Sequence, residues 1–428
     1  MRWKSGWYSR TDRPDQEYLV NIALIMHELL VEGGGERQCV CLARELTELG
    51  HQVTIYTSAH ARENCFPRLF ADLNVQEMGR GIFPWLRKPR FIRGYFDMVR
   101  LARVVKTRHE IWNPQHWPAH WGAVWLKQKM GGVVVWMSND VPNLHEKAHQ
   151  QHPIRNILKA IVYRLFYFYD RAQIRKVDLT VLVSSWAESE FRLIYPGRTC
   201  VARPGIDPDQ FRPGGDRTGI RRRFRYAPED FVLLWLGILM PHRRLEDAIE
   251  ALAELRKRSL KAKLLIAGSE DAFPEYVNSL KAQVTRLGLE HDVIFAGRIE
   301  DGEIRDFYCA CDAFLFPNEH QTWGLAVLEA MACGCPVVVS KGAAVHEALL
   351  ENENGMLFPA RNPAALADRI AVLLNQPSLR HKIAERGMQL ARTRFSWQYY
   401  AQQVSGLFKQ AAGLAPMERH LSEELTAE

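Results

Sequence analysis

Short apolar runs of strand length recur along the chain, and segments with helical periodicity separate them. The first run is Val20–Met26, which is followed by the glycines 33–35 and by an expected helix over Cys39–Leu49. A second run, Val53–Thr57, is rich in β-branched residues. Continuous apolar strands joined by helices are typical of parallel sheets that are covered on both faces. The alternation therefore predicts a doubly wound α/β fold of the Rossmann-like class.

The same alternation occupies both halves of the chain. In the first half we expect further strands at Val133–Met137 and Leu179–Val183, with a helix over Ile154–Tyr169. In the second half, helices such as Leu245–Leu255 alternate with five expected strands, which are Phe231–Leu236, Ala262–Ala267, Val293–Ala296, Ala313–Phe316 and Pro336–Val339. Because 428 residues exceed what one hydrophobic core usually serves, we expect two domains.

The stretch Arg203–Gly215 is rich in Pro, Gly and charge, which marks a domain boundary. We predict an N-terminal domain over 1–210 and a C-terminal domain over 211–395. Residues 396–428 are expected to form a helix at Trp397–Phe408, packed back on the first domain, and then a polar tail. Two parallel sheets that face each other place the carboxyl ends of their strands on a shared cleft, where ligands bind in open α/β folds.

The composition, 47% hydrophobic and 25% charged, is typical of a folded protein. No segment approaches the roughly 18 uncharged apolar residues of a membrane span, and the first residues hold no apolar core of a secretion signal, so we expect a cytoplasmic protein. The eight cysteines form three Cys-x-Cys pairs and no Cys-x-x-Cys spacing. We therefore expect reduced, mostly buried thiols and no zinc or dithiol site.

Positive charge is concentrated in the first half. Residues 1–210 hold 29 Lys/Arg against 21 Asp/Glu, whereas 211–428 hold 27 against 28. Much of the excess falls in 83–108, where basic and aromatic residues interleave. This pattern suits an anionic membrane surface on the inner face of the cell membrane, or an acidic acceptor. An ordinary solvated loop and helix is the open alternative. We expect no nucleic-acid partner.

The segment Asn318–Ser340 has the pattern of a strand end, a polar loop, a helix and the next strand. Gly324 stands where that helix begins, so the free N–H groups of the first turn can donate to hydroxyls or phosphate. Glu329 falls within the otherwise apolar Leu325–Ala332, and a buried carboxylate needs partners. Two ribose hydroxyls would supply them; the alternative is a glutamate that points to solvent.

Two further segments suit phosphate. The glycines 33–35 follow a strand and open a helix, where backbone N–H groups can hold an anion, although the sequence is not G-x-G-x-x-G. Arg243 and Arg244 follow the expected strand Phe231–Leu236, and paired guanidiniums can donate to a diphosphate. The alternative for these arginines is a surface pair bonded to Glu246 or Asp247.

Together with these features, several motifs resemble the retaining glycosyltransferases of family 4, which have the two-domain GT-B fold. The resemblance covers nearly the whole chain. It includes Gly33–Arg37 with Leu42, Gly50–Thr54, Arg203–Asp207 with Phe211, Gly237–Arg244, Ala296–Arg298, Glu329–Pro336 and Asn354-Gly355. It implies transfer of a sugar from a nucleoside-diphosphate sugar to an acceptor hydroxyl, with retention and without a metal or cofactor. Cell-envelope glycan or glycolipid assembly is the expected setting.

The resemblance also implies roles for individual residues. Arg243 would bind the donor diphosphate, near Gly237, and Glu329 would hold the ribose of the nucleotide. Backbone groups of the donor site would be those of Trp323, Gly324, Leu325, Arg298 and Ile299, with Gly34 and Gly35 approaching from the other domain. The segment Trp112–His120 resembles an acceptor-side loop that bears a histidine, and His116 and His120 compete for that role.

Three positions depart from the pattern of the family. Gln321 replaces a glutamate, Ile238 stands where many relatives have an arginine that Arg244 would replace, and Asn139 stands where relatives often have histidine. Asp207-Pro-Asp209 is similar to a metal-binding D-x-D pair, but Asp207 belongs to a turn motif of the family. Two alternatives stay open: a sugar-nucleotide epimerase, which can share the two-domain fold, and a binding protein with weakened catalysis, which Gln321 and Ile238 suggest.

Overall fold

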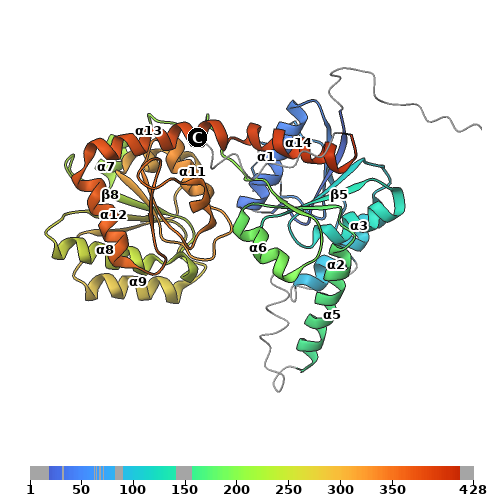
Figure 1. Ribbon diagram of the computed structural model, residues 1–428. Coiled ribbons are helices and arrows are strands. Elements are labelled where there is room, and N and C mark those ends of the chain that lie inside the picture. Colours follow the sequence, from blue (N-terminus) through green and yellow to red (C-terminus); the bar gives the residue numbers. More distant parts are fainter. Residues whose placement is uncertain are drawn as a thin grey trace, which may run out of the picture.

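The computed structural model describes residues 19–30, 33–61, 63, 65–66, 69–70, 72–81, 90–140 and 157–414. Two α/β domains lie side by side in it, each built on its own parallel sheet, as Figure 1 shows. The predicted fold of two Rossmann-like domains is therefore confirmed. Residues 82–89 of the basic and aromatic segment, and the tail beyond 414, lie outside the described residues.

The first sheet has seven parallel strands in the order β3-β2-β1-β4-β5-β6-β7. Its strands are β1 (Asn21–Met26), β2 (Gln52–Thr57), β3 (Val75–Glu77), β4 (Ile111–Gln115), β5 (Val133–Ser138), β6 (Leu179–Leu182) and β7 (Thr199–Val201). The helices of this domain are α1 (Gly34–Glu48), α2 (Arg90–Val104), α3 (Ala119–Met130), α5 (Ile157–Ile174) and α6 (Ser185–Ile194). The order reverses between β1 and β4, which is where ligands bind in such sheets.

The second sheet has six parallel strands in the order β10-β9-β8-β11-β12-β13. They are β8 (Val232–Leu236), β9 (Lys263–Ala267), β10 (Val293–Gly297), β11 (Ala313–Phe316), β12 (Val337–Ser340) and β13 (Met356–Phe358). Its helices are α7 (Arg217–Arg223), α8 (Leu245–Lys257), α9 (Pro274–Arg286), α10 (Ile304–Ala310), α11 (Leu325–Ala332), α12 (Pro363–Asn375) and α13 (Pro377–Arg394). Short 3-10 turns are η1 (Pro241–Arg243), η2 (Asp301–Glu303) and η3 (Ala344–Ala348). The order here reverses between β8 and β11.

Four short or polar strands, β3, β4, β7 and β13, were not expected from the sequence. The clearest correction is β4, because it begins the segment Trp112–His120 that we expected to be a loop. Asn113, Pro114 and Gln115 disfavour a strand in the middle of a sheet. All five residues of β4 are nevertheless buried. The amide of Asn113 explains this, since it donates to the carbonyl of Val135 at 2.5 Å and accepts from Gln115 at 2.5 Å.

The last helix, α14 (Trp397–Ala411), returns to the first domain and packs against α1 (Figure 1). Gln38 of α1 donates to the hydroxyl of Tyr400 at 2.6 Å, and the imidazole of His51 lies 2.7 Å from the hydroxyl of Ser405. The chain crosses between the domains twice, and the two crossings are hydrogen-bonded to each other: Ile206 N–H donates to the carbonyl of Phe395 at 2.7 Å. The domains are thus joined by a paired hinge.

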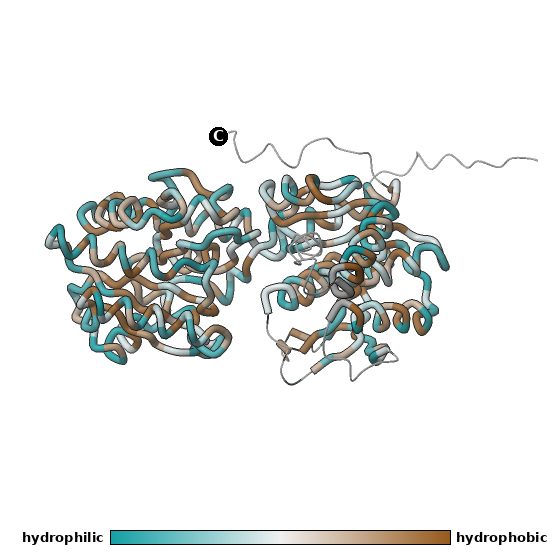
Figure 2. The backbone as a smooth tube through the Cα atoms, turned by 90° about the horizontal axis from the view of Figure 1, so that it is seen from below, coloured by the Kyte–Doolittle hydropathy of each residue, from teal (hydrophilic) through white to brown (hydrophobic). Residues whose placement is uncertain are grey.

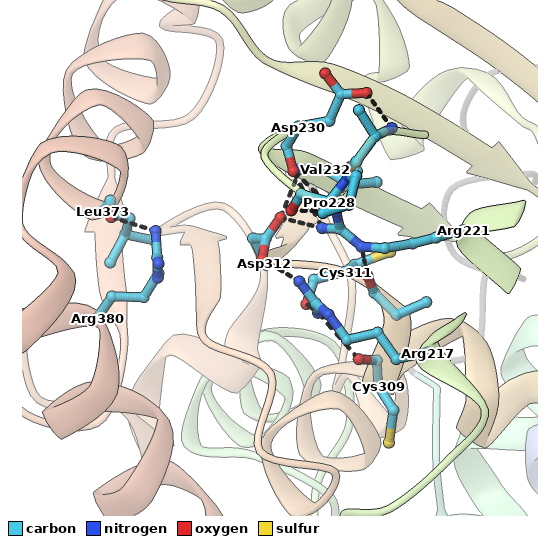
Figure 3. Close-up of polar contacts among 12 residues, drawn as sticks. Arg217, Arg221, Pro228, Asp230, Val232, Cys309, Cys311, Asp312, Leu373 and Arg380 are labelled. Carbon is cyan, nitrogen blue, oxygen red and sulfur yellow. Dashed lines mark hydrogen bonds and ion pairs between the residues drawn. The ribbon is translucent and has the colours of Figure 1, made fainter. Parts of the chain in front are cut away.

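Apolar and polar stretches alternate along the backbone in both domains (Figure 2). Figure 3 shows an ion pair of the second domain, in which the arginine is buried and the aspartate is partly buried. Arg221 of α7 is 6% exposed and donates to Asp312 at 2.7 Å and to the carbonyl of Ala310 at 3.0 Å. Asp312 also accepts from the backbone N–H of Val232 at 2.8 Å. This pair anchors α7 beside the first strand of the second sheet.

Candidate active site

The first domain presents an imidazole at the end of β4. His116 follows this strand, and its Nε2 lies 3.1 Å from Nδ2 of Asn139, which follows the neighbouring β5. Gly35, in the first turn of α1, is so close that a Cβ atom there would collide with Nε2 of His116. His116 has a left-handed backbone, with φ of 61°, which is uncommon for a residue other than glycine and occurs often at functional sites.

Burial lowers the pKa of His116, although the nearby carboxylates of Asp140 and Glu36 oppose the shift. The imidazole is therefore neutral at pH 7 and can exchange hydrogen bonds in either direction. His120 is placed differently: its side chain is completely buried, with Nε2 3.0 Å from the buried carboxylate of Asp170. Of the two competing histidines, His116 is the one beside the glycines.

The second domain presents a guanidinium at the end of β8. Arg243 lies in η1, and its side chain packs so closely on Gly237 that a Cβ atom there would collide with Nη1. Within the part of the chain that the structure describes, no carboxylate pairs with Arg243, and its Nε is buried without a hydrogen-bond partner. Burial lowers the pKa of Arg243. A partly buried cation without a counter-charge is unfavourable, so an anionic ligand is the expected partner.

Arg244 differs from its neighbour. Its guanidinium lies 2.7 Å from Glu246 and donates to Asp247 at 2.7 Å. These are the two partners of the alternative considered from the sequence. The side-chain bond to Asp247 raises the pKa of Arg244. Among the described residues, Arg243 therefore has no carboxylate partner, whereas Arg244 is already neutralised by two.

Glu329 is buried in α11 and does not point to solvent. Its Oε2 accepts from the hydroxyl of Tyr308 at 3.0 Å, and its Oε1 lies 3.7 Å from Nη1 of Arg37. Burial raises the pKa of Glu329, and the charge of Arg37 together with the Tyr308 bond opposes this. The carboxylate retains capacity to accept, because the Arg37 contact is longer than a hydrogen bond.

Arg37 reaches across from the first domain. It extends from the first turn of α1 and donates to Asp301 of the second domain at 2.9 Å. Arg37, Asp301, Leu325 and Glu329 line a pocket of about 600 Å³ that also includes hinge residues. Arg37 belongs to the motif Gly33–Arg37, in which the sequence suggested no role for this residue. A basic residue one turn after the glycines was the available signal, but only the structure shows its two acidic partners.

The loop before α11 is held by backbone and hinge contacts. Gly324 is the N-cap of α11, and the carbonyl of Gln321 accepts from Ala344 N–H at 2.9 Å. The indole of Trp323 is buried and donates to the carbonyl of Pro204 in the hinge at 3.1 Å. Leu325 lies partly buried on the pocket wall. This loop therefore links the expected donor site to the hinge.

The remaining predicted residues lie where their strands end. Arg298 and Ile299 follow β10, with Arg298 exposed and Ile299 partly buried. Gly34 begins α1, with open space around its Cα, whereas Gly33 is the N-cap. Gly34 and Gly35 thus belong to the first turn of the helix, which begins five residues earlier than the helix expected from the sequence at Cys39–Leu49.

Two contacts across the cleft were missed by the sequence analysis. Thr322 donates to Asp140 of the first domain at 3.1 Å. Glu347, in η3, accepts from the backbone N–H groups of Ser185 at 3.0 Å and Trp186 at 2.8 Å, at the start of α6, and Arg203 lies 2.9 Å away. The carboxylate of Glu347 suits this position, because negative charge is stabilised at a helix N-terminus. Ser185 and Glu347 are 162 residues apart, so the local sequence does not predict their contact.

Among the described residues, His27, Glu28 and Asp97 bring three possible metal-ligand atoms within 4.8 Å of one another. These groups already pair internally: His27 lies 2.8 Å from Asp97, and Glu28 lies 2.9 Å from Arg93 and 3.2 Å from Arg80. No helix in the described part of the chain is long and apolar enough to cross a membrane.

The chain is similar to curated proteins over most of its length. It is 26% identical over 404 residues to D-inositol 3-phosphate glycosyltransferase 2 of Catenulispora acidiphila, covering 89% of this chain and 90% of that protein. It is 24% identical over 389 residues to mannosylfructose-phosphate synthase of Agrobacterium fabrum, covering 86% and 84%.

Solved structures share the fold. Anabaena HepE, solved with UDP and glucose, gives a TM-score of 0.72 at 21% identity, covering 91% of this chain and 99% of that one. Sucrose-phosphate synthase of Thermosynechococcus elongatus gives a TM-score of 0.73 at 19% identity, covering 92% and 100%. The family profile described as Glycosyltransferase Family 4 matches residues 32–210, and that described as Glycosyl transferases group 1 matches 216–390. The chain therefore belongs to glycosyltransferase family 4 and is a glycosyltransferase.

Proposed function

We propose that this glycosyltransferase moves a hexosyl group from a nucleoside-diphosphate sugar to an acceptor hydroxyl with retention. The observation that carries the proposal is Arg243 in η1, after β8, which is partly buried and has no carboxylate partner among the described residues. Glu329 supports it, because a buried carboxylate with free accepting capacity suits the two hydroxyls of a ribose. Backbone groups of Trp323 to Leu325 at the start of α11, and those of Arg298 and Ile299, complete the proposed donor site.

Departure of the nucleoside diphosphate develops negative charge on its β-phosphate. A preorganised guanidinium at that position stabilises the transition state more than the ground state. Arg243 suits this role because it needs no reorganisation and has no competing carboxylate. Arg244 adds less, since Glu246 and Asp247 already neutralise it. The first turn of α1, with Gly34 and Gly35, supplies further N–H groups from the opposite domain.

The acceptor would enter from the first domain. His116 and Asn139 offer neutral donors and acceptors that can hold a hydroxyl group near the anomeric carbon. Gln321 would contact the donor sugar through its amide. In the proposed retaining reaction the acceptor attacks from the face that the phosphate leaves, and the phosphate takes the proton. The proposal assigns no resident metal or organic cofactor to this reaction.

A thermal-shift screen with UDP-, GDP- and ADP-sugars tests donor binding, since a ligand that binds the folded state raises the melting temperature. UDP-glucose comes first because HepE was solved with it. A stabilising donor is then incubated with and without candidate acceptors. Acceptor-dependent release of nucleoside diphosphate, with a retained linkage by NMR, supports the proposal. Conversion of the donor without any acceptor favours an epimerase instead, and donor binding without turnover favours a binding protein.

We also propose peripheral contact with an anionic membrane, which would suit cell-envelope acceptors. On α5, Ile161, Leu165 and Phe168 are 49%, 63% and 64% exposed. At about 100° per residue they form one stripe along the helix. The two carboxylates of α2 and α5, Asp97 and Asp170, are both buried, so the exposed charge of these helices is positive. In Figure 1, α5 projects from the first domain beside α2.

Between α2, α3 and α5 lies an open groove of about 660 Å³ that combines aromatic with basic residues: Tyr95, Trp125, Tyr169, Arg103, Lys106 and Lys129 are among its lining. Such a surface suits lipid headgroups next to an apolar interface. Co-sedimentation with vesicles tests the contact. The triple variant Ile161→Ser, Leu165→Ser, Phe168→Ser should lose binding to anionic vesicles. The control Leu193→Ser, at a site on α6 that is 80% exposed, should bind them as the wild type does. Equal binding of both variants, or equal binding to neutral vesicles, contradicts the contact.

A further inference from the structure

Two thiols lie beside the proposed ribose carboxylate. Tyr308 and Cys309 are neighbours on α10, whereas Glu329 and Cys333 are one turn apart at the end of α11. The Tyr308 hydroxyl donates to Glu329 at 3.0 Å, and Sγ of Cys309 lies 3.9 Å from the backbone carbonyl oxygen of Cys333. The same two helices therefore meet twice, once through the tyrosine and the carboxylate and once through the cysteines.

Cys309 has the environment of a reactive thiol. It is partly exposed, whereas Cys333 is buried. A hydrogen bond from the Cys333 thiol and one from the backbone N–H of Gly215, with the charge of Arg305, lower the pKa of Cys309 to about 6 despite partial burial. The partner thiol shows the opposite shift, since the shared hydrogen bond and burial raise the pKa of Cys333. A lowered pKa increases the fraction of Cys309 that is present as thiolate at neutral pH.

Other cysteines differ from Cys309 in the pKa of their thiols, which sets how much reactive thiolate is present. Burial raises the pKa of Cys200 to about 12, although that side chain is also partly exposed. Burial likewise raises the pKa of Cys39, Cys41 and Cys311. Reactive cysteines combine thiolate character, access and a nearby second thiol. Among the cysteines just compared, Cys309 has all three.

We propose that Cys309 and Cys333 form a reversible disulfide that switches the donor site. The oxidant is a peroxide. The Cys309 thiolate attacks one peroxide oxygen, which gives a sulfenic acid and, after protonation of the leaving oxygen, water or an alcohol. The Cys333 sulfur, having lost its proton, then attacks the Cys309 sulfur. The S–S bond forms as the sulfenic oxygen leaves as water. A thiol such as dithiothreitol reverses the step by exchange.

The consequence for the donor rests on the proposed function, in which Glu329 holds the ribose. A disulfide needs sulfur atoms about 2 Å apart, so the ends of α10 and α11 must approach each other. That movement displaces Tyr308 relative to Glu329, and their hydrogen bond holds the carboxylate in place. We therefore expect the oxidised protein to bind nucleoside diphosphates at least tenfold more weakly than the reduced protein.

The test uses the full-length reduced protein, treated with hydrogen peroxide at pH 7 and digested for mass spectrometry after blocking free thiols. The expected product is a Cys309–Cys333 cross-linked peptide that disappears after dithiothreitol. Cys309→Ser and Cys333→Ser should each abolish it. Cys200→Ser is the matched control, because Cys200 is a partly exposed thiol with a raised pKa, and the cross-link should form unchanged in it.

The outcomes separate this inference from the proposed function. If Cys309 reacts no faster than Cys200, or if it stops at a sulfenic acid without Cys333, the switch is contradicted. Equal nucleotide affinity of cross-linked and reduced protein contradicts it as well. Absence of nucleotide binding to the reduced wild type contradicts the proposed function, whereas the cross-link remains a separate result. The melting temperature of each reduced serine variant is compared with that of the reduced wild type, to check that the variant is folded.

Discussion

The two halves of the candidate site sit on sheets of the same architecture but differ in charge. In the second domain Arg243 follows β8, is partly buried and has no carboxylate partner among the described residues, and helix α11 presents Glu329. In the first domain the strand ends present His116 and Asn139, which are neutral and bonded to each other. In the proposed function, a guanidinium at a strand end suits an anionic donor, and a neutral imidazole with an amide suits a hydroxyl acceptor. The proposed assignment of donor and acceptor rests on this difference, because the two sheets share the same architecture.

Net charge alone suggests the reverse assignment. The positive excess of the chain lies in residues 1–210, with 29 Lys/Arg against 21 Asp/Glu. Much of that charge is on helices such as α2 and α5, outside the cleft. The second half is nearly balanced, yet it places one guanidinium without a counter-charge at a strand end. A single partly buried charge without a partner among the described residues therefore indicates more about a ligand than the net charge of a domain does.

Arg243→Ala is the strongest test of the charged half. Loss of one preorganised donor costs about 3 kcal/mol of transition-state stabilisation, so turnover should fall by about a hundredfold or more. Arg244→Gln should reduce turnover less, because its charge is already neutralised. The measurement is the rate of nucleotide release with the donor and acceptor found by screening. Arg258→Gln, at an exposed pair with Asp368, is the control. Equal losses of turnover in Arg243→Ala and Arg244→Gln would contradict the different roles proposed for the two arginines.

Glu329→Gln tests whether the carboxylate of Glu329 binds the ribose of the nucleotide. A hydrogen bond to a charged acceptor is worth about 1.5–3 kcal/mol, and the neutral amide should retain only part of it. We expect donor affinity to fall about tenfold, as measured by calorimetry with the nucleoside diphosphate. Tyr308→Phe removes the hydroxyl that donates to Glu329 and should reproduce a smaller part of the loss. Unchanged affinity in Glu329→Gln would show that the carboxylate does not contact the nucleotide.

Arg37→Met tests how the first domain influences the donor half. Burial raises the pKa of Glu329, and the charge of Arg37 opposes that shift. Removing the charge should raise this pKa further, so the carboxylate becomes protonated at a higher pH. Nucleotide affinity of Arg37→Met should therefore decline earlier than that of the wild type as the pH falls, and recover at high pH. Affinity measured across this range, with Arg37→Lys as the charge-retaining variant, checks the shift. Parallel pH profiles in all three proteins would contradict the coupling.

Gln321→Glu should give the smallest effect. A charged acceptor binds a sugar hydroxyl more strongly than an amide by about 1 kcal/mol, so turnover should rise about fivefold if Gln321 contacts the donor sugar. Initial rates at saturating donor provide the readout. A fall in turnover would indicate that the amide is adapted to its donor and that position 321 is not a weakened version of the family glutamate.

The sequence predicted the regular parts of the fold well. Strands such as β8, β9 and β11 are continuous apolar runs, and their boundaries differ from the expected ones by at most one residue. β4 was missed because Pro114 and two amide side chains hide it, and only burial against β1 and β5 makes it a strand. Short strands such as β13 lack enough residues for a periodic signal.

The candidate site was predictable where local pattern suffices. Glycines at a helix start, Arg243 after a strand and Glu329 within an apolar helix could all be identified in the linear chain. Long-range pairs could not. Arg37 and Asp301 are 264 residues apart, and Tyr308 is 21 residues from Glu329. The different surroundings of the two histidines likewise appear only in the structure, where His120 is buried beside Asp170 and His116 lies beside Gly35.

Calorimetric titration of UDP, GDP and ADP into wild type and Arg243→Ala tests the central claim most directly. The account predicts that at least one of these nucleotides binds the wild type at one site, and that Arg243→Ala weakens this binding by about tenfold or more while Arg258→Gln binds as the wild type does. Binding that is equally strong in wild type and Arg243→Ala would contradict the claim that this unpaired guanidinium holds the diphosphate of the donor.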